Sequence, residues 1–149
     1  MRFLERRRIL REARLQDEQL VSAVAGLEAS DGSRFEGDLA AVRDMWRAHE
    51  RSREEALYEP AVRLLSNGPD VTVALASEHR SFRTVLDNMD VGIHDLNVAG
   101  RQQLSALSRE IAAHAGHEER RVLRPLLRRL SNRDGKRLVE SLASRGSSE

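Results

Sequence analysis

Apolar residues recur every three or four positions through most of this 149-residue chain, and residues that break helices stand between the apolar blocks. This spacing places the apolar side chains on one face of a helix. Period-two alternation and clusters of β-branched residues between turn signals do not occur, so no strand is predicted. The pattern therefore predicts an all-α protein.

The positions of the helix breakers predict four long helices and a short one. The stretches ASDGS, SNGPD and DVGIHDLN separate the long blocks, and they are rich in the residues that end helices and form turns. Long helices joined by short connections form up-down-up-down bundles. We therefore expect one domain over residues 1–149, a four-helix bundle of this kind with a short C-terminal helix, whose helices cover Phe3–Glu28, Phe35–Leu65, Val71–Met89, Val98–Leu130 and 133–144.

The composition excludes several kinds of site. The chain has no cysteine, so any metal must be bound by histidine and carboxylate groups. Charged residues make up 33% of the chain but the net charge is only +1, and aromatic residues make up 3%, which does not suit a nucleic-acid surface. No apolar run is long enough to span a bilayer, and the charged stretch MRFLERRRILREARL is unlike a signal peptide. We expect a cytoplasmic protein.

The two halves of the chain resemble one another. The segment HERSREEALYEP at 49–60 aligns with HAGHEERRVLRP at 114–125, so that each begins with a histidine and ends with a proline. The segment EHRSFRTVLDNM at 78–89 aligns with QDEQLVSAVAGL at 16–27, which sets His79 opposite Asp17. The chain is therefore predicted to contain two copies of a helix pair.

Polar residues interrupt the inward stripe of every long helix near its middle. The four stripes, in chain order, are Leu10, Asp17, Leu20, Val24 and Leu27; Leu39, Val42, Trp46, His49, Arg53, Leu57 and Leu64; Leu75, His79, Phe82, Leu86 and Met89; and Leu104, Leu107, Ile111, His114, Glu118, Val122 and Leu126. Several ionisable groups at one level of a small core are costly unless they pair or bind a metal. We therefore expect a metal site formed from Asp17, His49, His79, His114 and Glu118.

Other polar residues are expected outside this site. His94 falls in a loop and His117 on an outer face. Glu54, Glu55 and Glu119 are expected on solvated faces, although a small helix rotation would bring Glu54 or Glu119 inward. The arginines of the fourth helix are expected on an outer face, with glutamate partners at helical spacing: Arg120, Arg121, Arg124, Arg128 and Arg129.

The segments EHRSF, HAGHEERRVLRPLL and HERSREEALYEP resemble the hemerythrin-like family, the HHE cation-binding domain, over about residues 16–130. The resemblance implies a four-helix bundle around a non-heme di-iron centre. In that family helices one and three each give a histidine, and helices two and four each give a His-x-x-x-Glu pair. His79, His114 and Glu118 match this pattern.

The first half of the chain departs from the family pattern at two positions. Asp17 stands where helix one should give a histidine, and Arg53 stands where helix two should give a glutamate. Arginine stays protonated and cannot bind a metal. Because the two residues lie on inward stripes and carry opposite charges, we expect an Asp17–Arg53 ion pair that replaces part of one iron's ligand set and disfavours a second metal nearby.

Three states of the site are compatible with these residues. A di-iron centre would need Asp17 as a ligand and Glu54 as the bridge. A single iron or zinc ion would use an N/O ligand set of His49, His79, His114 and Glu118. In the third state the site has lost its metal and is a polar network in the core.

The resemblance implies a protein that binds a non-heme metal, with iron expected, and that binds, senses or detoxifies a small oxidant such as dioxygen, nitric oxide or peroxide, or handles iron. We expect a binding or sensing protein rather than an enzyme, because the Glu-x-x-His pairs of ferritin-like enzymes are absent and HEERR lacks the second histidine of a His-Glu-x-x-His motif. The alternative is a metal-free or single-metal bundle that acts as a regulatory or protein-interaction domain.

Overall fold

The computed structural model describes residues 3–30, 32–89 and 98–143, and every regular element in these ranges is helical. This confirms the all-α prediction for the described residues; the predicted loop with His94 lies outside them. The helical elements are α1 (Phe3–Gly26), the 3₁₀ turn η1 (Leu27–Ala29), α2 (Gly32–Arg53), the π turn η2 (Glu54–Tyr58), α3 (Glu59–Leu64), α4 (Gly68–Asp87), α5 (Val98–Glu118), the π turn η3 (Glu119–Leu123), α6 (Arg124–Arg129) and α7 (Asn132–Ala143).

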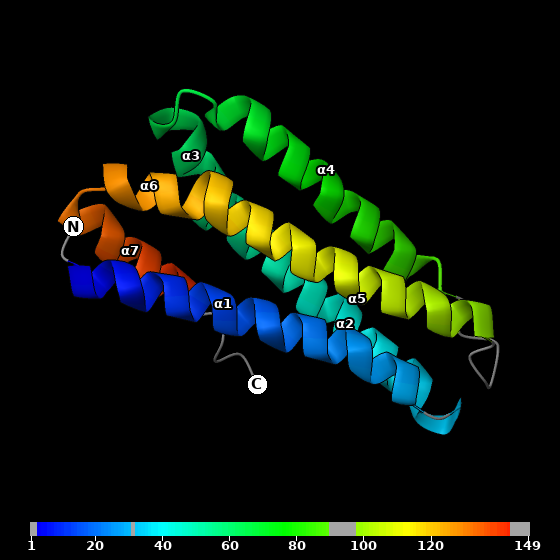
Figure 1. Ribbon diagram of the computed structural model, residues 1–149. Coiled ribbons are helices and arrows are strands. Elements are labelled where there is room, and N and C mark those ends of the chain that lie inside the picture. Colours follow the sequence, from blue (N-terminus) through cyan, green and yellow to red (C-terminus); the bar gives the residue numbers. More distant parts are fainter. Residues whose placement is uncertain (1–2, 31, 90–97, 144–149) are drawn as a thin grey trace.

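The four long helices lie side by side, as Figure 1 shows. Helix α1 packs against α2 and α5, and α4 packs against the same two helices from the other side. The short helix α7 packs on α1. These neighbours are compatible with an up-down-up-down bundle.

Two π turns occur at matching positions of the two sequence halves. η2 directly follows Arg53 and η3 directly follows Glu118, and each is five residues long. A proline stands two residues after each turn, at Pro60 and Pro125. A proline ring clashes with the carbonyl group four residues earlier, which lies inside each turn, so the helix widens there instead of continuing as a regular α-helix. The same local structure at matching positions supports the predicted duplication.

The predicted inward stripes are largely buried. Every stripe residue of α4 is buried, as is the whole stripe that runs from α5 into α6. Among the apolar stripe residues, two positions differ from the prediction. Ile9 is the fully buried residue of the first turns of α1, where Leu10 was expected. Leu64 is 40% exposed, because α3 ends there and Leu65 turns into an extended conformation and packs on the core instead.

The apolar core is divided into two clusters. One contains Ala13, Leu57, Leu75 and Val122 and is covered by Leu142 of α7. The other contains Leu20, Trp46, Phe82 and Ile111. On each long helix the residues between these two clusters are polar, and we call this set the polar layer: Asp17, His49, Arg53, His79, His114 and Glu118.

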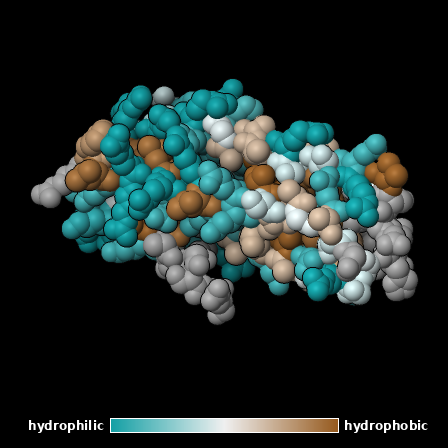
Figure 2. Space-filling view, turned by 60° about the horizontal axis from the view of Figure 1, so that its bottom comes forward, coloured by the Kyte–Doolittle hydropathy of each residue, from teal (hydrophilic) through white to brown (hydrophobic). Residues whose placement is uncertain are grey.

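The outer surface is mostly hydrophilic on the face in Figure 2, where apolar residues lie in small groups. The five arginines expected on the outer face of the fourth predicted helix are all exposed. None of the helices that the structure describes combines the length and hydropathy required to cross a membrane.

Two glycine substitutions should have opposite effects on stability, because Gly68 lies at the contact between α3 and α4 and Gly37 lies on an exposed face of α2. A Cβ added at Gly68 would lie 2.7 Å from the carbonyl carbon of Ala61, whereas one added at the exposed Gly37 meets nothing within 4 Å. We expect Gly68→Ala to destabilise the protein by about 2 kcal/mol through overpacking. Gly37→Ala should stabilise it by about 0.5 kcal/mol, because alanine favours a helix interior. Urea denaturation of both variants tests this contact, and equal effects would contradict it.

Candidate metal centre

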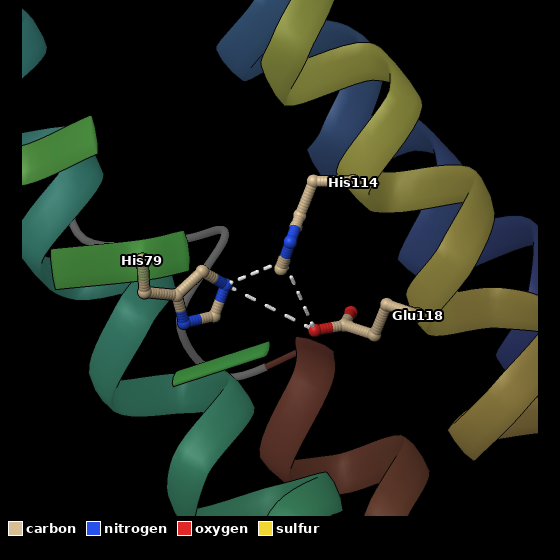
Figure 3. Close-up of side chains that lie close together, drawn as sticks. All are labelled: His79, His114 and Glu118. Atoms are coloured by element: carbon tan, nitrogen blue, oxygen red, sulfur yellow. Dashed lines mark hydrogen bonds and ion pairs between the residues drawn. The ribbon is translucent and has the colours of Figure 1, made fainter. Parts of the chain in front are cut away.

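Three buried side chains of the polar layer converge between α4 and α5. His79 comes from α4, and His114 and Glu118 come from successive turns of α5, as Figure 3 shows. One potential ligand atom from each lies within 4.8 Å of the other two. Within the described parts of the chain, this is the one group of three or more such residues.

The distances within this group suit a metal ligand set. His114 Nε2 lies 2.8 Å from His79 Nε2, and Glu118 Oε2 lies 3.8 Å and 4.0 Å from these two nitrogens. The other ring nitrogen of His79, Nδ1, is buried without a hydrogen-bond partner. Two imidazole nitrogens and one carboxylate oxygen are the mixed donors that iron and zinc accept in proteins. The group could therefore hold a metal ion.

Glu78 orients His114, and the sequence analysis did not identify it. Its Oε2 lies 2.6 Å from His114 Nδ1, and its side chain is 44% exposed. A carboxylate only accepts hydrogen bonds, so Nδ1 carries the hydrogen and Nε2 faces the cluster. A carboxylate on the far nitrogen of a histidine is the usual support of a metal-binding imidazole. The sequence held a signal for it, since Glu78 immediately precedes the stripe residue His79 in the segment EHRSF.

Tyr58 is the second residue that the sequence analysis missed. Its hydroxyl donates a 2.6 Å hydrogen bond to Glu118 Oε2 and lies 3.5 Å from His79 Nε2. Its ring stacks on that of His79, with centroids 5.6 Å apart. It is the single tyrosine of an aromatic-poor chain. Its placement depends on the π turn η2, which could not be read from a regular helical period.

Arg53 pairs with Asp17, as the sequence predicts. The Arg53 side chain has no exposure, and its Nη2 donates to Asp17 Oδ1 at 2.6 Å and to the Ala13 carbonyl oxygen at 3.1 Å. Its Nε also lies 3.0 Å from Glu118 Oε1. The guanidinium therefore connects α1 with α5 through two carboxylates.

The pKa values of these groups follow from burial and charge. Burial raises the pKa of Asp17 to about 6, because loss of water outweighs the attraction of Arg53. Burial acts against the charged form of Arg53 too, but the charges of Glu118 and Asp17 raise its pKa above the usual value. For Glu118 the pKa falls well below the usual range, since Arg53 and His114 outweigh its desolvation. The pair therefore stabilises the charged form of Arg53, whereas it does not fully offset the cost of burying the charged form of Asp17.

The three buried histidines differ in their protonation. Burial lowers the pKa of His79 to about 3 and lowers that of His49 well below the usual value. Burial also acts to lower the pKa of His114, but Glu118 and Glu78 raise it above the usual value. His79 and His49 are therefore neutral at pH 7, the form in which histidine binds metals.

His49 lies in the polar layer beside the three-residue group. Its ring stacks on Trp46 with centroids 5.4 Å apart, and its centroid lies 5.7 Å from that of His79. Its Nδ1 is 4.0 Å from Asp17 Oδ1. His49 therefore faces the Asp17–Arg53 pair, and its role as a ligand stays a prediction.

The remaining candidates lie further out. The structure does not bring Glu54 into the layer: it is exposed at the start of η2, so its predicted role as a bridge finds no support in this placement. Glu119 forms ion pairs with Arg14 at 2.8 Å and Arg124 at 2.7 Å on the outside of the bundle. His117 is exposed, as expected.

No protein-family model matches the chain, and neither a curated protein nor a solved structure is significantly similar to it. The residues and geometry described above are therefore the basis for a functional proposal.

The buried Asp17–Arg53 pair predicts a clear loss of stability in one variant. Asp17→Ala leaves the guanidinium of Arg53 with Glu118 as its remaining carboxylate partner, and we expect a loss of about 3 kcal/mol, the lower end for a broken buried pair. Glu18→Ala, an exposed neighbour, is the control and should change stability by less than about 0.5 kcal/mol. Chemical denaturation at pH 7.5 measures both, and equal effects would contradict the pair's importance.

Proposed function

We propose that this protein is a hemerythrin-like metal-binding bundle with up-down-up-down topology, and that His79, His114 and Glu118 form the core of its metal site. The single observation that carries the proposal is the burial of these three donor groups at one level, between two apolar clusters. Donor groups buried in this way are costly unless they pair or bind a metal. The agreement of the same three residues with the motif of the family is the second support.

The residues around the group fit a metal ion. The nitrogen donors of His79 and His114 face each other, and Glu78 fixes the ring of His114 from outside. Glu118 is held from two sides, with Arg53 at Oε1 and Tyr58 at Oε2. Ligands that are positioned before the metal arrives lose little freedom on binding it.

The surroundings of the group suit a small uncharged ligand. Phe82 lies edge-on to His114 with ring centroids 5.6 Å apart, and Leu107, Ile111 and Leu86 continue the apolar wall in the neighbouring cluster. Such a lining excludes bulk water. Iron, the metal we propose, would supply redox chemistry and an open coordination position for a diatomic or a peroxide. Binding or sensing of a small oxidant is the function that these features support best.

A metal-free interaction domain is the second candidate. It is favoured by one observation: the polar layer is held together by its own contacts, such as the hydrogen bond from Tyr58 to Glu118 and the Arg53–Asp17 pair. In that case the exposed arginines of α6 and η3 would be the surface for an acidic partner.

Metal analysis of three matched variants separates the two candidates. Wild-type protein from iron-supplemented medium should contain iron, and His114→Ala should lose it because one of three donors is gone. Glu78→Gln, which keeps the ligands and removes the supporting charge, should bind iron about 10–100-fold more weakly. His117→Ala, on the exposed face of the same helix, is the control and should match the wild type.

Thermal denaturation with and without iron(II) under anaerobic conditions gives an independent readout. A ligand that binds only the folded state raises the melting temperature. The wild type and His117→Ala should gain stability from iron(II), and His114→Ala should not. Wild-type protein that neither contains iron nor responds to it would overturn the metal proposal in favour of the interaction domain.

A further inference from the structure

Arg53 is a buried positive charge in direct contact with the proposed metal site. Its side chain has no exposure, and its Nε lies 3.0 Å from Glu118 Oε1. The histidines and Tyr58 lie at the other oxygen, Oε2. The two oxygens of one carboxylate therefore face two different partners, a permanent cation on one side and the proposed metal ligands on the other.

The first half of the polar layer has few donors for another metal. Asp17 Oδ1 is already 2.6 Å from Arg53 Nη2, and His49 Nδ1 lies 4.0 Å from that same oxygen. Glu54 is exposed at the start of η2. Within residues 3–30, 32–89 and 98–143, His79, His114 and Glu118 are the one group with metal-ligand spacing. A second ion would have two donors and would lie beside a fixed positive charge.

The charge balance of the polar layer also disfavours a second metal ion. Asp17 and Glu118 carry two negative charges when ionised, and the guanidinium of Arg53 neutralises one of them. Histidine binds a metal in its neutral form, so the side chains of the layer carry one negative charge when the metal is bound. A single iron(II) ion would leave the layer with one positive charge, whereas a second ion would leave it with three, in a site that excludes water.

We propose that Arg53 takes the place of a second cation, so that the centre holds one metal ion and Glu118 is shared between that ion and the guanidinium. This inference rests on the metal binding proposed above. It departs from the di-iron centre that the resemblance implies, because the residues of the first half do not fit a second iron. The arginine then has the structural role that a second ion would have, as a bridge from Glu118 to the carboxylate of α1.

Metal stoichiometry tests the proposal directly. Metal-free wild-type protein is titrated anaerobically with iron(II), and bound iron per chain is measured after removal of free metal and again by native mass spectrometry. We expect one iron per chain. Arg53→Glu removes the positive charge and places a carboxylate four residues after His49, and we expect its stoichiometry to rise from one to two.

Arg51→Glu is the matched control, because it makes the same change in charge on an exposed position of α2. It should bind one iron per chain. Circular dichroism establishes that each variant is folded. If Arg53→Glu does not fold, the neutral Arg53→Gln replaces it, and the wild-type stoichiometry by itself still decides whether the centre holds one ion.

Each outcome has a definite meaning. One iron in the wild type and two in Arg53→Glu support the proposal. Two irons in the wild type overturn it, while the proposed metal-binding function stands. One iron in both folded proteins shows that Arg53 is not what limits the number of ions. No iron in the wild type overturns the proposed function together with this inference.

Discussion

The charge of Arg53 is the constraint on which the centre of this bundle depends. A guanidinium keeps its proton under all ordinary conditions, so a buried arginine must find negative partners inside the protein. Here the partners are Asp17 on α1 and Glu118 on α5, at 2.6 Å and 3.0 Å. Three helices are thereby held at one level. The hydroxyl of Tyr58 in turn fixes Glu118 at its second oxygen. Because the ring of Tyr58 stacks on His79, the same network extends to α4.

The two halves of the chain have kept the same local structure while their chemistry differs. Both have a π turn directly after the inward pair and a proline beyond it. In the second half the inward pair is His114 and Glu118, which together with His79 form the group of potential metal ligands. In the first half the corresponding pair is His49 and Arg53, and the positive charge of Arg53 is paired with the carboxylates of Asp17 and Glu118. The two similar halves thus place the candidate metal ligands on one side and a fixed cation on the other.

The sequence predicts most of the helices because their apolar stripes and breakers are local signals. It also predicts the Asp17–Arg53 pair, since two opposite charges on facing stripes have to meet. Glu78 and Tyr58 were missed for different reasons. Glu78 lies one residue from the stripe and reaches His114 because its side chain is long enough to do so. Tyr58 is placed by the π turn, and a regular helical period cannot reveal the extra residue in such a turn.

The polar layer divides the apolar core, and this division affects how the bundle unfolds locally. Each apolar cluster draws side chains from several of the packed helices and is continuous within its own end of the bundle. Between the ends, cohesion in the core depends on ion pairs and hydrogen bonds, which respond to salt and protons in a way that apolar packing does not. The two ends are thus suited to behave as separate cooperative units in slow amide exchange. An ion held by His79 and His114 would join them into one.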